Sequence, residues 1–217
     1  MASRQVLYRV DTKKKAVALT FDIANGHRVP LRMLSLLQKR GIHKATFFIT
    51  GIWAEMHPRI ARKIREKGFE IGSHGYRHKD YRKQNNAWIE HEVKKAGKAI
   101  YQATNIRTKL FRPPGGDMNP RVVRKLRALK QLIVHWDVDS LDWRITDVSK
   151  ILRRVVRHAR GGSILLLHAC DPWFQSLAAL PVIIKELRKK GFRFVTISEL
   201  MRMQSLTRPY RLGSGLK

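Results

Sequence analysis

The 217-residue sequence predicts an α/β fold, and three observations point to an irregular (β/α) barrel with about seven parallel strands. Apolar, β-branched runs alternate with amphipathic stretches of helical period, the pattern of strand–helix units around a parallel sheet. The runs are apolar almost throughout, as expected for strands that helices cover on both faces. Polar residues recur where the runs end, and a barrel gathers all strand ends around one mouth. A doubly wound open sheet satisfies the first two observations but would spread those residues along a line.

Short apolar runs are the predicted strands, because their length and β-branched content suit strands better than helices. In chain order they are Ala16–Phe21, Ala45–Thr50, Phe69–Gly72, Lys109–Arg112, Leu132–Val138, Ser163–His168 and Phe192–Thr196.

Amphipathic stretches between these runs are the predicted helices. They are Val29–Lys39, Pro58–Lys67, Ala87–Ala103, Pro120–Leu129, Val148–Ala159 and Leu177–Lys190. Gly41, Gly68 and Gly191 stand where a glycine commonly ends a helix. We expect Ser198 to cap a last short helix, Glu199–Met203.

The length suits one domain, and we expect a monomer. Residues 1–15 are predicted to be an N-terminal extension, residues 16–204 the domain and residues 205–217 a flexible tail. No run reaches the roughly 18 apolar residues of a membrane span, and no signal-peptide pattern opens the chain. The single cysteine, Cys170, excludes an internal disulfide and a Cys-based zinc site, and we expect it to be an inert buried thiol.

The net charge is extreme: 45 Lys and Arg residues stand against 16 Asp and Glu residues, giving +29. Such a field attracts polyanions, although it can also serve solubility alone. The cations are spread along the chain, and no basic tail stands apart as an arm. Nucleic acid, anionic lipid and acidic cell-wall polymers are the candidate partners, and of these nucleic acid is the least expected because no nucleic-acid-binding motif accompanies the cations.

Two histidines four residues apart are the first chemical signal. His74 and His78 follow the predicted strand Phe69–Gly72 in the sequence Ser-His-Gly-Tyr-Arg-His. On one helical turn, side chains at i and i+4 share a face, so both imidazoles could hold one metal ion. A metal site needs further ligands and usually a base, and the other strand ends offer both.

A carboxylate and a guanidinium follow two of the predicted strands. Asp22 can bind a metal or act as a general base, although a single aspartate in this position is more often a cap or a turn residue. Arg112 opens the stiff turn Arg-Pro-Pro-Gly-Gly, from which it can pair with a carboxylate bidentately and orient it.

Acids beside aromatic rings occur in the segment from Trp136 to Trp143, which contains three aspartates and two indoles. This combination suits a sugar site, in which rings stack on the pyranose and carboxylates bind hydroxyls. The run Leu-Leu-Leu-His ends in His168, which would serve as a general acid if a neighbouring carboxylate raised its pKa.

Five motifs in this order resemble those of the polysaccharide deacetylases of the NodB-homology group, the carbohydrate esterases that remove N-acetyl groups. They read Thr-Phe-Asp…Gly, His-xxx-His, Arg-Pro-Pro-Gly, Asp-xx-Asp-Trp and Leu-Leu-His, between about Ala16 and Met201. The segments Ser73–Tyr81 and Val138–Trp143 are most similar to the sporulation-type PdaB branch. The resemblance implies a distorted (β/α) barrel and an amide hydrolase that acts on C–N bonds other than peptide bonds.

The resemblance also implies a role for each matching residue. The implied catalytic residues are Asp22 as base, Arg112 as the group that orients it, His168 as acid, and Asp139 with Asp142 as the residues that tune the acid. His74 and His78 are the implied ligands of a divalent metal, usually zinc, with cobalt, nickel or manganese as alternatives. Trp143, Leu166, Pro113 and Tyr76 are the expected substrate-binding residues.

The implied substrate is a cell-wall or chitin-like polysaccharide, with peptidoglycan amino sugars preferred. The implied place of action is extracytoplasmic, at the cell wall, the membrane or the spore. Two alternatives remain: a catalytically impaired barrel that binds acidic cell-wall glycan, and a nucleic-acid-binding protein driven by charge.

The sequence departs from the family at one metal ligand. The family pattern Thr-Phe-Asp-Asp-Gly has a second aspartate as the third ligand, whereas Ile23-Ala24-Asn25 stands here between Asp22 and Gly26. If the loop is two residues longer, Asn25 takes the ligand position with a neutral amide oxygen. His27 or a water molecule are the other candidates.

Overall fold

The computed structural model describes residues 6–204, and the predicted tail at residues 205–217 lies outside the described part. Within it, eight strands form one sheet, and every ladder between them is parallel. The strands are β1 (Ala16–Ile23), β2 (Thr46–Ile49), β3 (Glu70–Ser73), β4 (Leu110–Phe111), β5 (Leu132–Ile133), β6 (Val138–Asp139), β7 (Ile164–His168) and β8 (Arg193–Val195).

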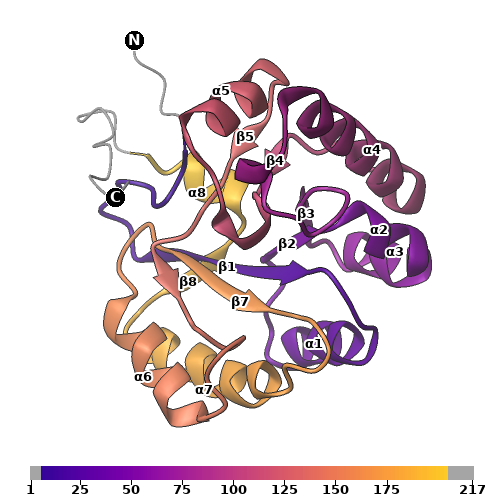
Figure 1. The fold of residues 1–217 in the computed structure, drawn as a ribbon. Helices are drawn as coiled ribbons and strands as arrows, with labels where there is room; N and C mark the ends of the chain where they lie inside the picture. The colour runs from indigo at the N-terminus through magenta and orange to yellow at the C-terminus, as the bar shows by residue number, and fades with distance from the viewer. Residues whose placement is uncertain (1–5, 205–217) are drawn as a thin grey trace.

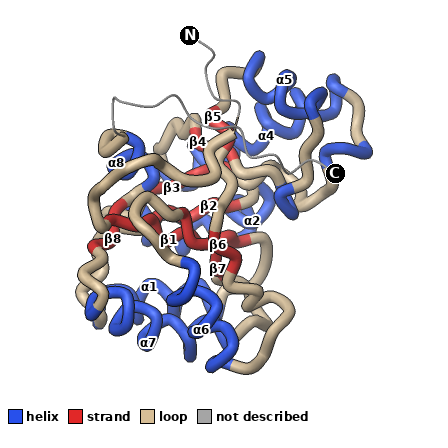
Figure 2. The backbone as a smooth tube through the Cα atoms, turned by 90° about the vertical axis from the view of Figure 1, so that its left-hand side faces the viewer, coloured by secondary structure: helices blue, strands red, loops and turns tan. Residues whose placement is uncertain are grey.

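Helices surround this sheet (Figures 1 and 2). They are α1 (Arg28–Lys39), α2 (Gly51–Met56), α3 (Pro58–Glu66), α4 (Asn86–Thr104), α5 (Pro120–Ala128), α6 (Val148–His158), α7 (Gln175–Lys189) and α8 (Ile197–Met201), with short 3-10 turns η1 (Tyr81–Lys83) and η2 (Pro114–Gly116). In both views α1, α6 and α7 lie on one side of the sheet, and α4 and α5 lie on the other. None of the helices in residues 6–204 combines the length and apolarity that a bilayer span requires.

The sheet curls in the order β5-β4-β3-β2-β1-β7-β6, and β8 pairs with the beginning of β1. Seven parallel strands on one curled path confirm the predicted distorted barrel. Residues 7–10 lie between β5 at one end of this path and the segment just before β7. The Leu7 amide donates to the carbonyl oxygen of Ile133 at 2.8 Å, and the Val10 amide donates to that of Gly162 at 2.9 Å.

The central strand β1 anchors the core because all eight of its residues are buried. Leu19, Phe21 and Ile23 pack with apolar side chains of α1 and α7, among them Leu37 and Ile183. Burying each such side chain contributes about 1.5–3 kcal/mol. This packing fixes the strand end that carries Asp22.

Three local predictions were wrong. The run Leu132–Val138 forms two strands rather than one, because Asp137 leaves the β5 line and its amide donates to the carbonyl oxygen of Ile164. The last helix is capped by Thr196 rather than Ser198, and Glu199 completes a capping box with Thr196. Helix α2 was not predicted; it has only six residues and begins at Thr50, whose hydroxyl accepts from the amide of Trp53.

Candidate active site

The predicted site residues follow neighbouring strands at their carboxyl ends. Asp22 lies on β1 opposite His168 on β7 in the parallel register. His74 follows β3, and Arg112 follows the short strand β4 that pairs with β3. Asp139 ends β6, which pairs with β7. The curl of the sheet therefore collects these side chains at one end of the barrel.

Arg112 and Asp22 form a buried ion pair. Nη1 of Arg112 donates to Oδ1 of Asp22 at 2.7 Å, and the Arg112 side chain has no exposed surface. Burial raises the pKa of Asp22, but the charge and hydrogen bond of Arg112, together with its interactions with the neighbouring histidines, outweigh this effect, so the carboxyl stays below its ordinary pKa and ionised. The expected bidentate contact is absent, because Nη2 of Arg112 donates instead to the carbonyl oxygen of His135 at 3.0 Å.

His74 lies against this pair and is neutral. Its Nδ1 bonds the carbonyl oxygen of Arg112 at 2.8 Å, and its Nε2 lies 3.6 Å from Oδ2 of Asp22. Burial lowers the pKa of His74 to about 4, against the attraction of Asp22. A neutral imidazole held at Nδ1 has the Nε2 lone pair available, which is the orientation of a metal ligand.

His78 approaches His74 through a loop rather than along a helix. The prediction of a shared helical turn was wrong, since residues 74–78 form no helix. The two imidazoles still meet edge to face, with ring centroids 5.1 Å apart. Gly75 between them has φ +76°, and a Cβ atom there would lie 2.6 Å from the hydroxyl oxygen of Tyr81. Only glycine fits this turn.

The loop that carries both histidines is anchored by α2 and α4. The amides of Gly51 and Ile52 donate to the carbonyl oxygens of Gly75 and Tyr76 at 2.8 and 3.1 Å. From α4, the fully buried carboxylate of Glu92 accepts from three N–H groups, the Arg77 amide, Nε and Nη2, at 2.9–3.0 Å.

The sequence interpretation did not identify Glu92. The signal was available: this acid stands on the apolar face of the predicted helix, one turn after Trp88 and Ile89 and one turn before Ala96.

His168 is held by a buried carboxylate. Nδ1 of His168 lies 2.7 Å from Oδ1 of Asp142, and the other oxygen of Asp142 accepts from the His168 amide and from the Ser176 hydroxyl. Burial lowers the pKa of His168, but the hydrogen bond and charge of Asp142, with Asp22 and Asp139, outweigh it and raise the pKa above the ordinary value. The ring of Trp173 lies edge-on to His168 at 4.9 Å.

Asp139 acts on the pKa of His168 through its charge and not through a hydrogen bond, as far as the described residues show. Its Oδ1 accepts from the Leu141 amide at 2.8 Å, and it makes no hydrogen bond with His168 in residues 6–204. Burial raises the pKa of Asp139, although the bond from Leu141 and the charge of His168 oppose this effect. Of the two aspartates predicted to tune the acid, Asp142 is the one in contact with it.

The four predicted substrate-binding residues differ in access. Trp143 is 45% exposed and follows Asp142 directly. Leu166 and Pro113 are buried. Tyr76 is 7% exposed, and its hydroxyl donates to Oε2 of Glu55 at 2.7 Å. Trp143 is therefore the member of the set that presents an open ring.

The role of Asn25 as a metal ligand stays a prediction. Ile23 is fully buried in the core, while Asn25 is exposed and makes no hydrogen bond with either histidine in the described part of the chain. The loop is turned toward β7, because Asp171 accepts from the amides of residues 27, 28 and 29. A Cβ atom on Gly26, at φ +78°, would lie 2.5 Å from Cγ of Asp171.

The donors that remain fit a divalent metal in part. His74 offers a neutral imidazole with free Nε2, His78 lies beside it, and the carboxylate of Asp22 faces Nε2. Imidazole and carboxylate are ligands that zinc accepts. In residues 6–204, however, no group of three or more His, Cys, Asp or Glu side chains is arranged around one metal position. The donor chemistry fits, but the aspartate that serves the family as third ligand is missing, because Ile23 follows Asp22.

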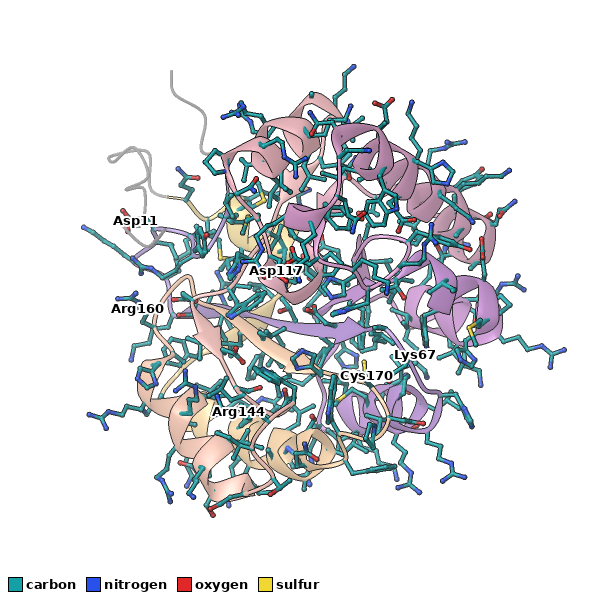
Figure 3. All side chains as sticks on the ribbon, in the orientation of Figure 1. Asp11, Lys67, Asp117, Arg144, Arg160 and Cys170 are labelled. Carbon is teal, nitrogen blue, oxygen red and sulfur yellow. The ribbon has the colours of Figure 1, made fainter. Side chains whose placement is uncertain are left out.

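Cys170 takes no part in this chemistry. It is buried near the ends of β1 and β7 (Figure 3), and its sulfur accepts from the amide of Ala24 at 3.2 Å. Burial raises the pKa of the Cys170 thiol to about 11, so it is protonated at neutral pH.

Known proteins share this architecture. The family model described as polysaccharide deacetylase matches residues 9–133. The peptidoglycan-N-acetylglucosamine deacetylase of Bacillus cereus is 33% identical over 91% of this chain and 93% of its own. The uncharacterized protein YlxY of Bacillus subtilis is 35% identical over 90% of this chain, which spans 60% of YlxY.

A solved structure adds a different relative. BA3943 of Bacillus anthracis, described as a CE4 family pseudoenzyme, matches 93% of this chain and 70% of its own with a TM-score of 0.84 and 30% identity. A mutant of BA3943 described as having restored enzymatic activity matches with a TM-score of 0.85 and 31% identity. The same fold thus occurs with and without catalysis.

Proposed function

Because this chain belongs to the polysaccharide deacetylase family, we propose that it removes N-acetyl groups from the amino sugars of a cell-wall polysaccharide. One observation supports catalysis above all: an ionised Asp22 and a His168 of raised pKa flank the same pair of histidines. A base and an acid with separated pKa values are what amide hydrolysis requires.

The residues of the chain divide the proton transfers between them. Asp22, kept ionised by Arg112, accepts a proton from the attacking water. Asp142 binds His168 at Nδ1, which leaves Nε2 to donate a proton to the departing amine. Breaking the C–N bond then yields acetate and a free amino sugar. Trp173 shields one side of His168 from solvent, which strengthens its interaction with Asp142.

His74 and His78 would hold the divalent metal, with Asp22 facing it. Deacetylases of this family are generally metal-dependent. When bound, such an ion polarises a carbonyl oxygen and lowers the pKa of a bound water. We take zinc as the first candidate and cobalt, nickel and manganese as alternatives.

Peptidoglycan is the proposed substrate, because relatives over most of this chain are peptidoglycan deacetylases. The exposed ring of Trp143 beside Asp142 supplies a stacking surface for a sugar. Action outside the cytoplasm follows from that substrate.

Acetate release tests the proposal. The purified chain is incubated with chitooligosaccharides and with peptidoglycan, with added Zn²⁺ or Co²⁺ and with EDTA. We expect metal-stimulated release that is lost in Asp22→Asn, a variant that keeps the shape of the side chain but not its charge. Release that survives in Asp22→Asn would remove Asp22 as the base.

A second function is favoured by the core position of Ile23, which removes a family metal ligand. In this alternative the barrel binds acetylated glycan without hydrolysing it, as a pseudoenzyme would. It predicts no acetate release under any metal and retained binding of chitooligosaccharide by Asp22→Asn. Metal analysis of the purified protein separates the two, since the catalytic function expects about one divalent ion per chain.

A further inference from the structure

The outer face of α1 carries several cations that form no ion pair within the described part of the chain. Lys and Arg side chains project around the outline of the molecule (Figure 3), and some of them form ion pairs. On α4 and α5, for example, Lys94 and Lys125 both pair with Glu90. None of the exposed cations on and just after α1 forms an ion pair with an acid in residues 6–204, and the same holds for Lys98 and Arg124 on α4 and α5; the α1 cations are Arg28, Arg32, Lys39 and Arg40.

Two surface grooves run beside these cations. One, of about 480 Å³, is lined by Leu31, Arg32, Ser35, Leu36, Lys39 and Arg40. The other, of about 410 Å³, lies between α1 and α3, shares Leu31 and Ser35 with the first, and adds Lys63 and Lys67. Glu66 is the acid in this lining. The first groove thus has three cations in its lining and no acid, and the second has two cations and one acid, so the lining of each carries net positive charge.

The first groove begins beside the active site. The Arg32 guanidinium lies over the exposed ring of Phe174, 5.8 Å from its centroid. Phe174 follows Trp173, whose ring contacts His168. These contacts lead from the proposed acid through two neighbouring aromatic residues to Arg32, which lines the groove together with Lys39 and Arg40.

We propose that this groove along α1 binds the part of the peptidoglycan strand that extends beyond the catalytic site, through the carboxylates of its stem peptides. The inference rests on the proposed function for the identity of the strand. Exposed guanidinium and ammonium groups suit carboxylates, and the position beside His168 suits a polymer that already occupies the site. Aliphatic Leu31 and Leu36 line the groove, whereas single-stranded nucleic acid would call for stacking rings along it.

Sedimentation with insoluble peptidoglycan tests the surface without catalysis. The probe is sacculi freed of teichoic acid, and the full chain is used in EDTA. The test variant is Arg32→Gln/Lys39→Gln/Arg40→Gln. The matched control, Lys98→Gln/Arg124→Gln/Lys130→Gln, removes the same number of charges from exposed positions on and after α4 and α5, across the sheet (Figure 1). Circular dichroism checks that all three proteins fold.

We expect the α1 variant to bind about tenfold more weakly than wild type and the control to lose much less, with the difference fading at high salt. Equal loss in both variants would overturn the proposal in favour of diffuse charge. Loss confined to sacculi that retain teichoic acid would overturn it in favour of a phosphodiester polymer. Tighter binding of duplex DNA than of sacculi, weakened by the α1 substitutions, would assign the face to nucleic acid instead.

The result of the sedimentation test can be told apart from the result of the acetate-release test. Acetate release from short, neutral chitooligosaccharides by the wild type tests hydrolysis and involves no stem-peptide carboxylate. Sedimentation reads the α1 face whether or not the chain hydrolyses its ligand.

Discussion

Two histidines in the site are each held through the Nδ1 atom of the ring, but their pKa values are shifted in opposite directions. Nδ1 of His168 lies 2.7 Å from a carboxylate oxygen of Asp142, and Nδ1 of His74 lies 2.8 Å from the carbonyl oxygen of Arg112. The pKa of His168 is raised, whereas the pKa of His74 is lowered to about 4. Both rings are well buried, so the charge of the acceptor and of the neighbouring groups decides the sign.

The site has one half around His168 and another around His74, and the difference in pKa between the two histidines gives each half a separate chemistry. His168 faces Asp142, Asp22 and Asp139, so it can carry a proton at neutral pH. His74 has Asp22 on one side but also His78 and Arg112 nearby, and burial dominates. It therefore stays neutral and can donate a lone pair. Proton donation belongs to the His168 half and metal binding to the His74 half.

The largest expected effect comes from removing the charge that distinguishes His168. In Asp142→Asn the side chain keeps its shape but cannot stabilise an imidazolium, so the pKa of His168 falls. We expect kcat/KM for acetate release to drop about 10²–10⁴-fold and the alkaline limb of its pH profile to move to lower pH. Ser176→Ala is the control, since it removes a hydrogen bond to Asp142 but keeps the charge. An unmoved alkaline limb would contradict the assignment.

The second prediction is that His74 and His168 change the free energy of unfolding in opposite directions as the pH changes. His74 has a folded-state pKa of about 4 and an unfolded one near 6.5, so below pH 6.5 the unfolded chain takes up a proton that the folded chain refuses. Stability should fall by about 3 kcal/mol from this group between pH 7 and pH 4. His168 acts in the opposite sense: its raised pKa contributes stability at low pH that is lost as pH rises through the folded value.

Urea unfolding in EDTA measures this dependence between pH 4 and pH 7. His135 is also shifted to about 4 by burial, so the informative quantity is the difference between wild type and His74→Gln. We expect a shallower loss of stability toward pH 4 in the variant. Equal slopes in the two proteins would show that His74 titrates normally.

The sequence predicted the fold and the residues at each strand end, because apolar periodicity and the order of five motifs are local signals. It did not predict how the loops present those residues. His74 and His78 meet through a turn at Gly75 rather than on a helix, and the anchor of that turn, Glu92, is distant in sequence. Nor did the sequence predict that Asp171 holds the loop after Asn25 through the amides of residues 27, 28 and 29. Contacts between distant loops have no pattern in one sequence.

The third prediction tests Glu92 as a positioning residue for the His74 half. Glu92→Gln keeps an acceptor for the Arg77 amide but loses the ion pair between the buried carboxylate and the half-exposed Arg77 guanidinium, so His78 should move relative to His74. We expect the affinity for Zn²⁺, measured by equilibrium dialysis, to fall about 10–100-fold. Glu90→Gln on the same helix, which breaks exposed pairs with Lys94 and Lys125, should leave it unchanged. Equal losses in both variants would mean that α4 affects metal only through general stability.

The smallest expected effect is at Trp143. This residue follows Asp142 in the chain and is not expected to change the pKa of His168. The ring is 45% exposed, directly after Asp142, so its loss should weaken sugar binding and leave the acidity of His168 intact. We expect Trp143→Ala to raise KM for chitooligosaccharide about 3- to 10-fold with kcat nearly constant, and Trp143→Phe to recover part of the loss. Tyr101→Ala removes a 37% exposed ring from α4 and should change neither constant. A fall in kcat with unchanged KM would contradict this prediction. It would mean that Trp143 helps to position Asp142, and thereby His168, without a hydrogen bond to either residue.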